Sequence, residues 1–310
     1  MTNPFFEFLL MRPHQLGFLG FLNVMLLTAC LPSEPQNPLL QGTGSYTYTP
    51  PAPLEQRPVQ VHFYVPAQVN SQTPVLMVFH GNERNAIQYR NDLLSLATSQ
   101  GVLLLVPEFS ETYFPGNNSY HLGWMFADGE NAALSPLLPS NTWTYGLPDA
   151  IFEDVRRKNF LSQTQYNAIG HSAGAQFLHR LLMYQTNHQI KRAVVSAAGW
   201  YNLPDTGLAF PHGLRFAPYQ NPALVSLFNR PHILQVGLLD NNPNSSALRH
   251  DSLTDLQGLH RLARAQYYHR ICSLFSLANN QSLAWSLQVV PNLDHSSGPA
   301  VQAAFGRLFP

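Results

Sequence analysis

Residues 170–174 read Gly-His-Ser-Ala-Gly, a Gly-x-Ser-x-Gly pentapeptide that lies between a predicted strand and a predicted helix. Residues 165–169 have the apolar character of a short buried strand, and residues 175–184 place apolar side chains at helical spacing. A strand that enters a helix through one tight turn holds its serine in a strained conformation, and glycine is needed on both sides because a side chain there would collide with neighbouring backbone. The pattern predicts that Ser172 is a nucleophile at the carboxyl edge of a sheet, beside the positive end of a helix.

A serine that attacks an acyl group needs a base to take its proton and an acid to orient that base. His295 follows a late predicted strand and is the expected base, while Asp240 ends the apolar run 233–240 and is the expected acid. The resulting chain order, serine, aspartate and then histidine, is that of α/β hydrolases. Three other aspartates are rivals for the acid. Asp294 adjoins the histidine, and Asp251 and Asp255 stand further from a strand end than Asp240 does.

The tetrahedral intermediate of acyl transfer carries a negative oxygen, which two backbone N–H groups must face. One donor is expected from Ala173, directly after the nucleophile, and the other from Asn82, in the loop after the strand at 75–79. Gly81 lets this loop approach the serine closely. His80 is expected to brace the loop rather than to take part in the reaction.

Apolar runs alternate with amphipathic segments along most of the chain, and this alternation defines the fold class. Buried strands separated by helices of ten or more residues indicate an α/β fold with a mainly parallel, doubly wound sheet and helices on both faces. In such sheets, ligands bind at the carboxyl ends of the strands, where all the candidate residues lie. Expected strands are 59–65, 75–79, 102–106 (ended by Pro107), 165–169, 193–196, 233–236 and 285–290; expected helices are 89–99, 148–157, 175–184, 256–278 and 299–308.

Composition restricts the possible functions of the chain. Its 310 residues are 45% hydrophobic, which is enough for the core of one large domain. The 17 basic and 17 acidic residues give no net charge, and no basic cluster indicates a nucleic acid, a phosphate or a polyanion as a partner. No phosphate-binding, dinucleotide-binding or metal-binding motif is present, so neither a cofactor nor a metal is expected.

The N-terminus resembles a bacterial lipoprotein signal peptide. An uncharged stretch, residues 16–29, follows Arg12 and ends in Leu-Thr-Ala before Cys30, which the resemblance implies is lipidated; the start codon is that of Met1 or Met11. We therefore expect a signal peptide over 1–29, a lipidated, proline-rich and unpaired tether over 30–58, and a catalytic domain over 59–310. The expected location is the bacterial envelope, on the periplasmic side and by preference at the outer membrane. The alternative is an uncleaved apolar anchor. Cys272 is expected to be a buried structural thiol.

From about residue 75 to residue 309, the chain resembles α/β-hydrolase esterases of the polyhydroxybutyrate-depolymerase-like group. The resemblance implies Ser172 as nucleophile, Asp240 as acid and His295 as base, although Leu239 departs from the residue that often precedes this aspartate. The group name does not imply a polymer as the substrate. The matching segments are Phe79–Asn85, Pro107–Phe109, Tyr113–Gly116, Gly170–Phe177, Ala198–Tyr201, Gly237–Asp240 and Pro291–His295.

These observations predict a serine hydrolase that cleaves carboxylic esters of small molecules or polymers through an acyl-enzyme. Two alternatives stay open: a peptidase or amidase with the same residues, and a catalytically silent hydrolase-fold lipoprotein that binds an envelope partner. Aromatic residues in loops at the carboxyl edge either line a substrate pocket or close the top of the core. They are Tyr113, Trp124, Trp200 and Tyr201.

Overall fold

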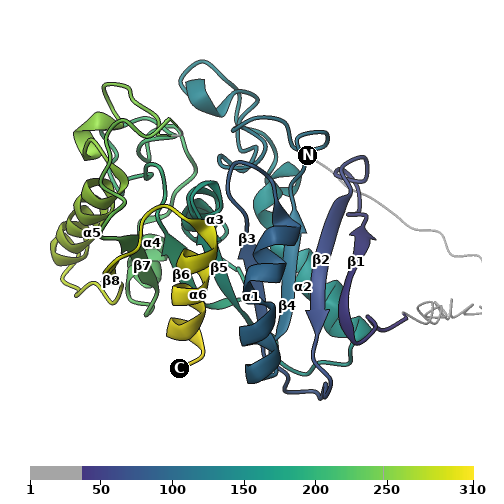
Figure 1. Cartoon of the computed structure of the whole chain (residues 1–310). Helices are drawn as coiled ribbons and strands as arrows, with labels where there is room; N and C mark the ends of the chain where they lie inside the picture. The colour runs from purple at the N-terminus through teal and green to yellow at the C-terminus, as the bar shows by residue number, and fades with distance from the viewer. Residues whose placement is uncertain (1–36, 247) are drawn as a thin grey trace, which may run out of the picture. The chain divides into compact units, whose positions relative to one another are not determined.

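The computed structural model describes residues 37–246 and 248–310. In this part of the chain, eight strands form one sheet in the order β1-β2-β4-β3-β5-β6-β7-β8 (Figure 1). The strands are β1 (Gly42–Tyr48), β2 (Val59–Val65), β3 (Val75–Phe79), β4 (Leu103–Glu108), β5 (Tyr166–His171), β6 (Ile190–Ser196), β7 (Ile233–Gly237) and β8 (Ser286–Val290). The helices are α1 (Ala86–Gln100), α2 (Leu147–Lys158), α3 (Ala173–Tyr184), α4 (Asn221–Phe228), α5 (Arg261–Ala278) and α6 (Ser297–Leu308).

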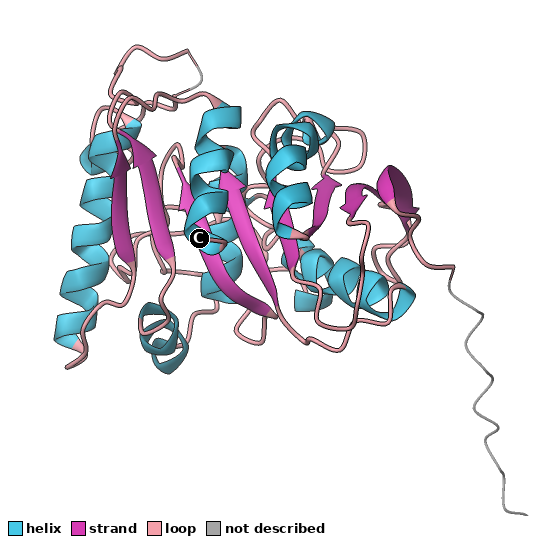
Figure 2. Ribbon diagram, turned by 60° about the horizontal axis from the view of Figure 1, so that its bottom comes forward, coloured by secondary structure: helices cyan, strands magenta, loops and turns pink. Residues whose placement is uncertain are grey.

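The sheet is parallel from β4 through β3 to β8, and β2 pairs antiparallel with both β1 and β4. Its central strands are almost entirely buried because helices cover both faces (Figure 2). One core lies between the sheet and helices α1 and α6, while a larger one lies between the sheet and helices α2 to α5. The predicted doubly wound α/β sheet is confirmed.

The proline-rich segment before residue 58 contains a strand that composition did not predict. Residues 42–48 form β1, which pairs along its whole length with β2. The expectation of unpaired backbone up to residue 58 was therefore wrong for this stretch. The prolines flank the strand, and between them Thr43, Tyr46, Thr47 and Tyr48 supply residues that favour extended backbone.

Two further elements differ from the expectations. Strand β4 continues through Pro107, which was expected to end it. Pairing of β3 with β4 stops at Leu105, so Pro107 has a neighbouring strand on one side only, where a sheet tolerates proline. The short helix α4 was not predicted.

The predicted signal peptide, Cys30 and the first part of the tether lie outside the described residues. Among the residues that are described, no helix is both long enough and apolar enough to cross a membrane. Cys272 is 1% exposed, so its prediction as a buried thiol is confirmed.

Candidate functional site

Ser172 occupies a sharp turn between β5 and α3. Its backbone has φ of 55°, a left-handed value that is rare for a residue with a side chain. An added Cβ at Gly170 would overlap the carbonyl oxygen of Gly174, and one at Gly174 would overlap the carbonyl oxygen of Phe79. The prediction that a side chain at either glycine would collide with neighbouring backbone is confirmed. The turn places the serine at the carboxyl edge of the sheet.

Ser172, His295 and Asp240 form one hydrogen-bonded chain, although they are far apart in the sequence. The Oγ of Ser172 lies 3.0 Å from Nε2 of His295, and Nδ1 of His295 lies 2.7 Å from Oδ2 of Asp240. Asp240 is 6% exposed, and its other oxygen lies 3.5 Å from a guanidinium nitrogen of Arg261. The arrangement gives the serine a proton acceptor and gives the histidine a buried carboxylate that fixes its orientation.

The rival aspartates have other partners. Asp251 pairs with Arg249 and caps a turn through backbone N–H groups at 253 and 254. Asp255 contacts His250 and Arg264. Asp294 is largely exposed and accepts a hydrogen bond from the backbone N–H of residue 296. The structure therefore brings only Asp240, among the four candidates, to His295.

The backbone N–H groups of Asn82 and Ala173 are the expected oxyanion donors. Both residues line a cavity together with Ser172. Neither N–H group has an acceptor in the described part of the chain. A Cβ at Gly81 would lie 3.8 Å from Cβ of Ser172, so this loop does approach the serine closely. Two N–H donors beside Ser172 that have no acceptor among the described residues can bind a developing negative oxygen.

His80 braces the loop at Gly81, as predicted, by linking it to Phe109. Its Nδ1 lies 2.9 Å from the carbonyl oxygen of Gly81, and its Nε2 accepts a hydrogen bond from the backbone N–H of Phe109. The side chain is fully buried, and burial lowers its pKa to about 3. His80 is therefore neutral, with Nδ1 as donor and Nε2 as acceptor.

Tyr89 also supports this loop, and this role was not predicted from the sequence. The backbone N–H of Gly81 donates to the hydroxyl of Tyr89, which lies 2.9 Å from Nδ1 of His171. Burial raises the pKa of Tyr89, so its hydroxyl stays protonated and donates to that nitrogen. The ring of His171 packs 4.9 Å from that of His295. Tyr89 thus joins the loop at Gly81 to the turn that holds Ser172.

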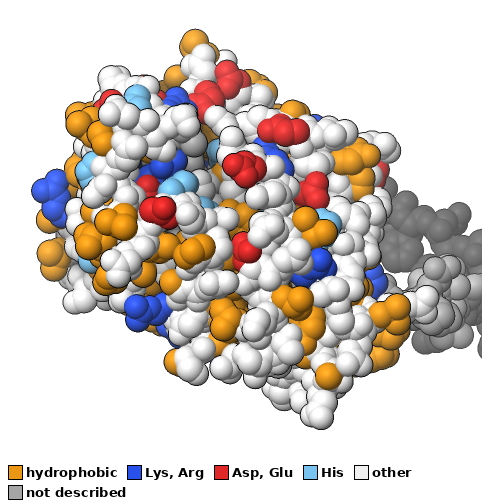
Figure 3. Space-filling view, in the orientation of Figure 1, with side chains coloured by type: hydrophobic (Ala, Val, Ile, Leu, Met, Phe, Trp, Pro, Cys, Tyr) orange, Lys and Arg blue, Asp and Glu red, His pale blue; other side chains and the backbone are white. Residues whose placement is uncertain are grey.

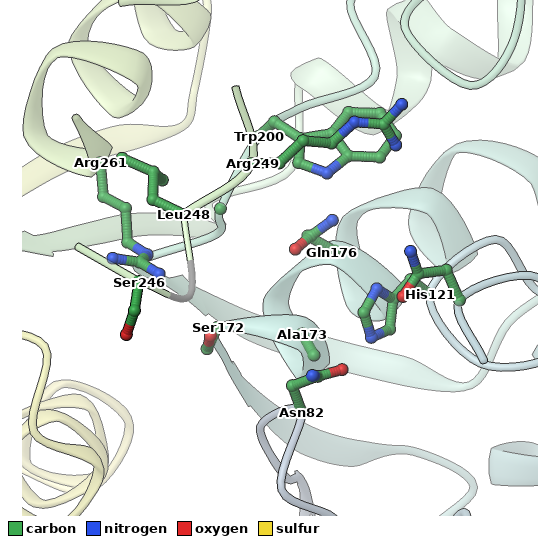
Figure 4. A pocket seen from close by; sticks show the side chains of 12 residues that line it. Asn82, His121, Ser172, Ala173, Gln176, Trp200, Ser246, Leu248, Arg249 and Arg261 are labelled. Carbon is green, nitrogen blue, oxygen red and sulfur yellow. The ribbon is translucent and has the colours of Figure 1, made fainter. Parts of the chain in front are cut away.

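Two cavities meet at Ser172. The larger, of about 390 Å³, lies beside the side chains labelled in Figure 4, and the smaller, of about 270 Å³, lies on the side of His295. The larger is lined by Asn82, Asn117, His121, Ser172, Ala173, Gln176, Gly199, Trp200, Ser246, Leu248, Arg249 and Arg261. The smaller is lined by Gly81, Asn82, Glu83, Asn85, Tyr89, His171, Ser172, His295, Ser296 and Ser297.

Of the four aromatic residues expected at a pocket, Trp200 lines the larger cavity. Tyr201 is fully buried and stacks on Tyr268 at 4.4 Å, which makes it part of the core. Tyr113 and Trp124 line neither cavity, and Trp124 packs beneath the guanidinium of Arg57. For these three residues the pocket interpretation was wrong, because a loop position alone does not indicate where an aromatic ring points.

Among the described residues, no group of three or more histidine, cysteine, aspartate or glutamate side chains has an arrangement that could hold a metal ion.

The strand order and the serine turn between β5 and α3 define an α/β hydrolase. Poly(aspartic acid) hydrolase-1 from Sphingomonas sp. KT-1 is 30% identical and superposes with a TM-score of 0.82 over 88% of this chain and 100% of its own. The LpqC poly(3-hydroxybutyrate) depolymerase from Bordetella parapertussis is 28% identical, with a TM-score of 0.79 over 87% of this chain and 91% of its own. The chain belongs to the α/β-hydrolase esterase family that includes these enzymes, and it is a hydrolase.

More distant structures share the fold alone. S-formylglutathione hydrolase (FrmB) from Staphylococcus aureus is 13% identical, with a TM-score of 0.55 over 88% of this chain and 100% of its own. No protein-family model and no curated protein sequence matches the chain.

Proposed function

We propose that the protein is a serine hydrolase that cleaves carboxylic esters through an acyl-enzyme. The observation that carries the proposal is the hydrogen-bonded chain from Ser172 through His295 to Asp240, next to two N–H donors that have no acceptor in the described part of the chain. In the first step, His295 takes the serine proton as Oγ attacks the carbonyl carbon, and the negative oxygen binds to the N–H groups of Asn82 and Ala173. His295 then gives its proton to the leaving alcohol. Water, activated by the same histidine, releases the acid.

Kinetics on a simple ester test this proposal. Purified residues 37–310 are expected to hydrolyse p-nitrophenyl acetate, and Ser172→Ala and His295→Ala are each expected to lower kcat by at least about a thousandfold. The remaining rate then reflects binding and the oxyanion donors alone. Activity that survives Ser172→Ala would remove this serine as nucleophile. Absence of activity in the unsubstituted protein would favour a silent binding protein.

Amide cleavage is the second candidate activity. Its support is the relative at 30% identity, whose name states that it hydrolyses poly(aspartic acid), a polymer joined by amide bonds. The same residues serve both reactions, since they differ chiefly in protonation of the leaving group. An ester and an amide of the same acyl group, compared by kcat/KM, distinguish the two. A larger kcat/KM for the amide would replace the ester proposal.

We also propose that the mature protein is lipidated at Cys30 and lies in the bacterial envelope on the periplasmic side, at the outer membrane. Support comes from the sequence: an uncharged segment, residues 16–29, ends in Leu-Thr-Ala-Cys. Several acyl chains on one cysteine would give a stable anchor. Cys30→Ser is expected to leave the signal peptide uncleaved or to release the protein into the soluble fraction. A processed, membrane-bound Cys30→Ser protein would contradict the proposal.

A further inference from the structure

The buried carboxylate of Asp240 lies between two nitrogen-bearing side chains. Its Oδ2 is 2.7 Å from Nδ1 of His295, and its Oδ1 is 3.5 Å from a terminal guanidinium nitrogen of Arg261. Among the described residues, Arg261 is the only lysine or arginine within ion-pair distance of this aspartate. Arg249, the other arginine of the larger cavity, pairs with two other carboxylates. The aspartate that orients the proposed base is therefore also one half of an ion pair.

The start of α5 holds Arg261 in this position. Arg261 is the first residue of the helix, is 1% exposed, and places a guanidinium nitrogen 3.4 Å from Oγ of Ser245. The backbone N–H of Leu262 donates to the backbone carbonyl of Asp240, which joins the helix start to the loop that carries the acid. In Figure 4 the Arg261 side chain extends toward Ser172. Because a buried ion pair is screened little by salt and water, Arg261 acts on Asp240 more strongly than a surface arginine would.

The remaining titratable groups around the proposed base, in the described part of the chain, carry either no charge or a negative one. Burial lowers the pKa of His171 well below 6.5 and raises the pKa values of Tyr89 and Tyr201, so these three side chains are neutral. Glu83 lines the smaller cavity together with the base, and Asp294 precedes the base in the chain and is largely exposed. Figure 3 shows acidic, basic and histidine side chains close together at a hollow in the upper part of the face that it presents.

A cation beside Asp240 lowers the proton affinity of the Asp240–His295 pair. The two groups share a hydrogen bond, so they titrate as a pair, and a proton that either one takes up makes the pair more positive by one charge. The positive charge of Arg261 opposes this uptake wherever the proton lies. The pair therefore stays free of the extra proton to a lower pH than it would without the arginine, and His295 stays able to accept the proton of Ser172.

We propose that Arg261 is a positioning residue for the reaction, which holds Asp240 toward His295 and keeps the histidine unprotonated, and so active as a base, in mild acid. Its guanidinium contacts Oδ1 of Asp240 and leaves Oδ2 to the histidine. Arg261 acts through Asp240 and not on the reacting atoms. The inference rests on the proposed serine mechanism.

The pH dependence of kcat/KM tests the proposal. Arg261→Met removes the charge and keeps an unbranched side chain in the same space. We expect the midpoint of the acid limb for p-nitrophenyl acetate, measured from about pH 5 to pH 9, to rise by at least about half a pH unit, because loss of the cation makes protonation of the pair easier. At the plateau, kcat is expected to fall by about tenfold or less, since the shape of the triad is kept. The rate at which a fluorophosphonate modifies Ser172 is expected to give the same midpoint without an ester.

Two further variants separate the charge of Arg261 from its packing. Arg261→Lys keeps the positive charge and is expected to move the midpoint less than half as far as Arg261→Met does. Arg264→Met, in the same helix, is the matched control: it removes a fully buried arginine that pairs with Asp255, and its midpoint is expected to stay that of the unsubstituted protein. Thermal unfolding shows whether each variant folds. Arg261→Gln, which keeps a donor for Asp240 but no charge, carries the same expectation as Arg261→Met and replaces it if that variant does not fold.

The failure of this inference differs from the failure of the proposed function. A folded Arg261→Met protein whose activity falls while its midpoint stays unchanged overturns the inference, because the arginine then only stabilises the structure. A shift in Arg261→Lys as large as that in Arg261→Met overturns the role of the charge. Neither result affects the proposed function, which fails if the unsubstituted protein shows no ester hydrolysis that depends on Ser172.

Discussion

At the scale of single residues, the type of a side chain says less than the partners around it. Four aspartates follow late strands, and the sequence favours Asp240 by its position at a strand end. Side-chain contacts, which no spacing rule predicts, then separate them: all but Asp294 lie near an arginine, but among the four only Asp240 contacts His295 in the described part of the chain. Serine and histidine could be predicted because a local pattern surrounds each. The acid depends on contacts between distant segments.

Asp240→Asn tests the residue that orients the histidine. The amide keeps the shape, but it loses the charge that stabilises protonated His295 and favours the wrong tautomer, so kcat for an ester is expected to fall by about 10³–10⁴-fold. Asp294→Asn, in the next residue to His295, is the control and is expected to retain most activity. Equal losses in the two variants would contradict the assignment of the acid.

Tyr89→Phe tests the hydrogen bonds that join the loop at Gly81 and Asn82, which carries one proposed oxyanion donor, to the turn at Ser172. The change leaves the buried N–H of Gly81 without its acceptor, and the loop is expected to lose its fixed position. We expect kcat to fall about tenfold with a small change in KM, since the oxyanion donors act on the transition state. Tyr64→Phe is the control, because Tyr64 packs in the same hydrophobic cluster as Tyr89 and its hydroxyl makes no hydrogen bond within the described residues. A change in KM alone would show that Tyr89 only shapes the cavity.

At the scale of the elements, the strands and helices that have a local sequence signal could be predicted. The partners with which the strands pair could not. The strand–serine–helix turn is encoded within five residues, and its glycines do what the sequence predicts. Strand β1 was missed because a count of prolines over a long window hides a short extended stretch between them. Strand β4 runs through Pro107 because its pairing with β3 ends before this residue. Which strand lies beside β4, and where their pairing ends, cannot be predicted from the local sequence.

Gly174→Ala tests the packing of α3 against the sheet. Its methyl group would overlap the carbonyl oxygen of Phe79, and backbone would have to shift, so the free energy of unfolding is expected to fall by about 1–3 kcal/mol. Gly306→Ala, inside α6, is the matched control: an added Cβ there meets nothing within 4 Å, and the change is expected to stabilise by about 0.5–1 kcal/mol. Urea unfolding measures both. A tolerated Gly174→Ala would contradict the close approach of helix and sheet.

At the scale of the whole molecule, the fold class and the edge that carries the site could be predicted from alternating strands and helices. The cavity walls could not, because they combine loops and helices from the whole length of the domain. Of the residues around the larger cavity, Asn82, Ser172, Ala173 and Trp200 were anticipated. Gln176 belongs to a predicted helix, and its place in the cavity wall is a property of the packed structure.

We expect the free energy of unfolding to fall in mild acid, because several histidines are buried in the folded protein. Burial lowers the pKa of each in the folded state below the usual 6.5, so the unfolded chain binds more protons between the two values. The free energy of unfolding and Tm are expected to fall as pH decreases from about 6.5, with more than one proton taken up on unfolding. The histidines are His80 and His232, with pKa values of about 3, His188 and His212, of about 4, and His121, His171 and His179, with pKa values well below 6.5.

The measurement is urea unfolding at a series of pH values between 4 and 7. Unfolding free energies that stay constant over this range would contradict the burial of these rings in neutral form.

The claim that Ser172 is an activated nucleophile is tested most directly by mass spectrometry after treatment with a fluorophosphonate. Residues 37–310 are expected to gain the mass of one phosphonyl group, and peptide mapping is expected to place it on Ser172. The Ser172→Ala protein is expected to gain none. An adduct on another residue, or an adduct that persists in Ser172→Ala, would contradict the account.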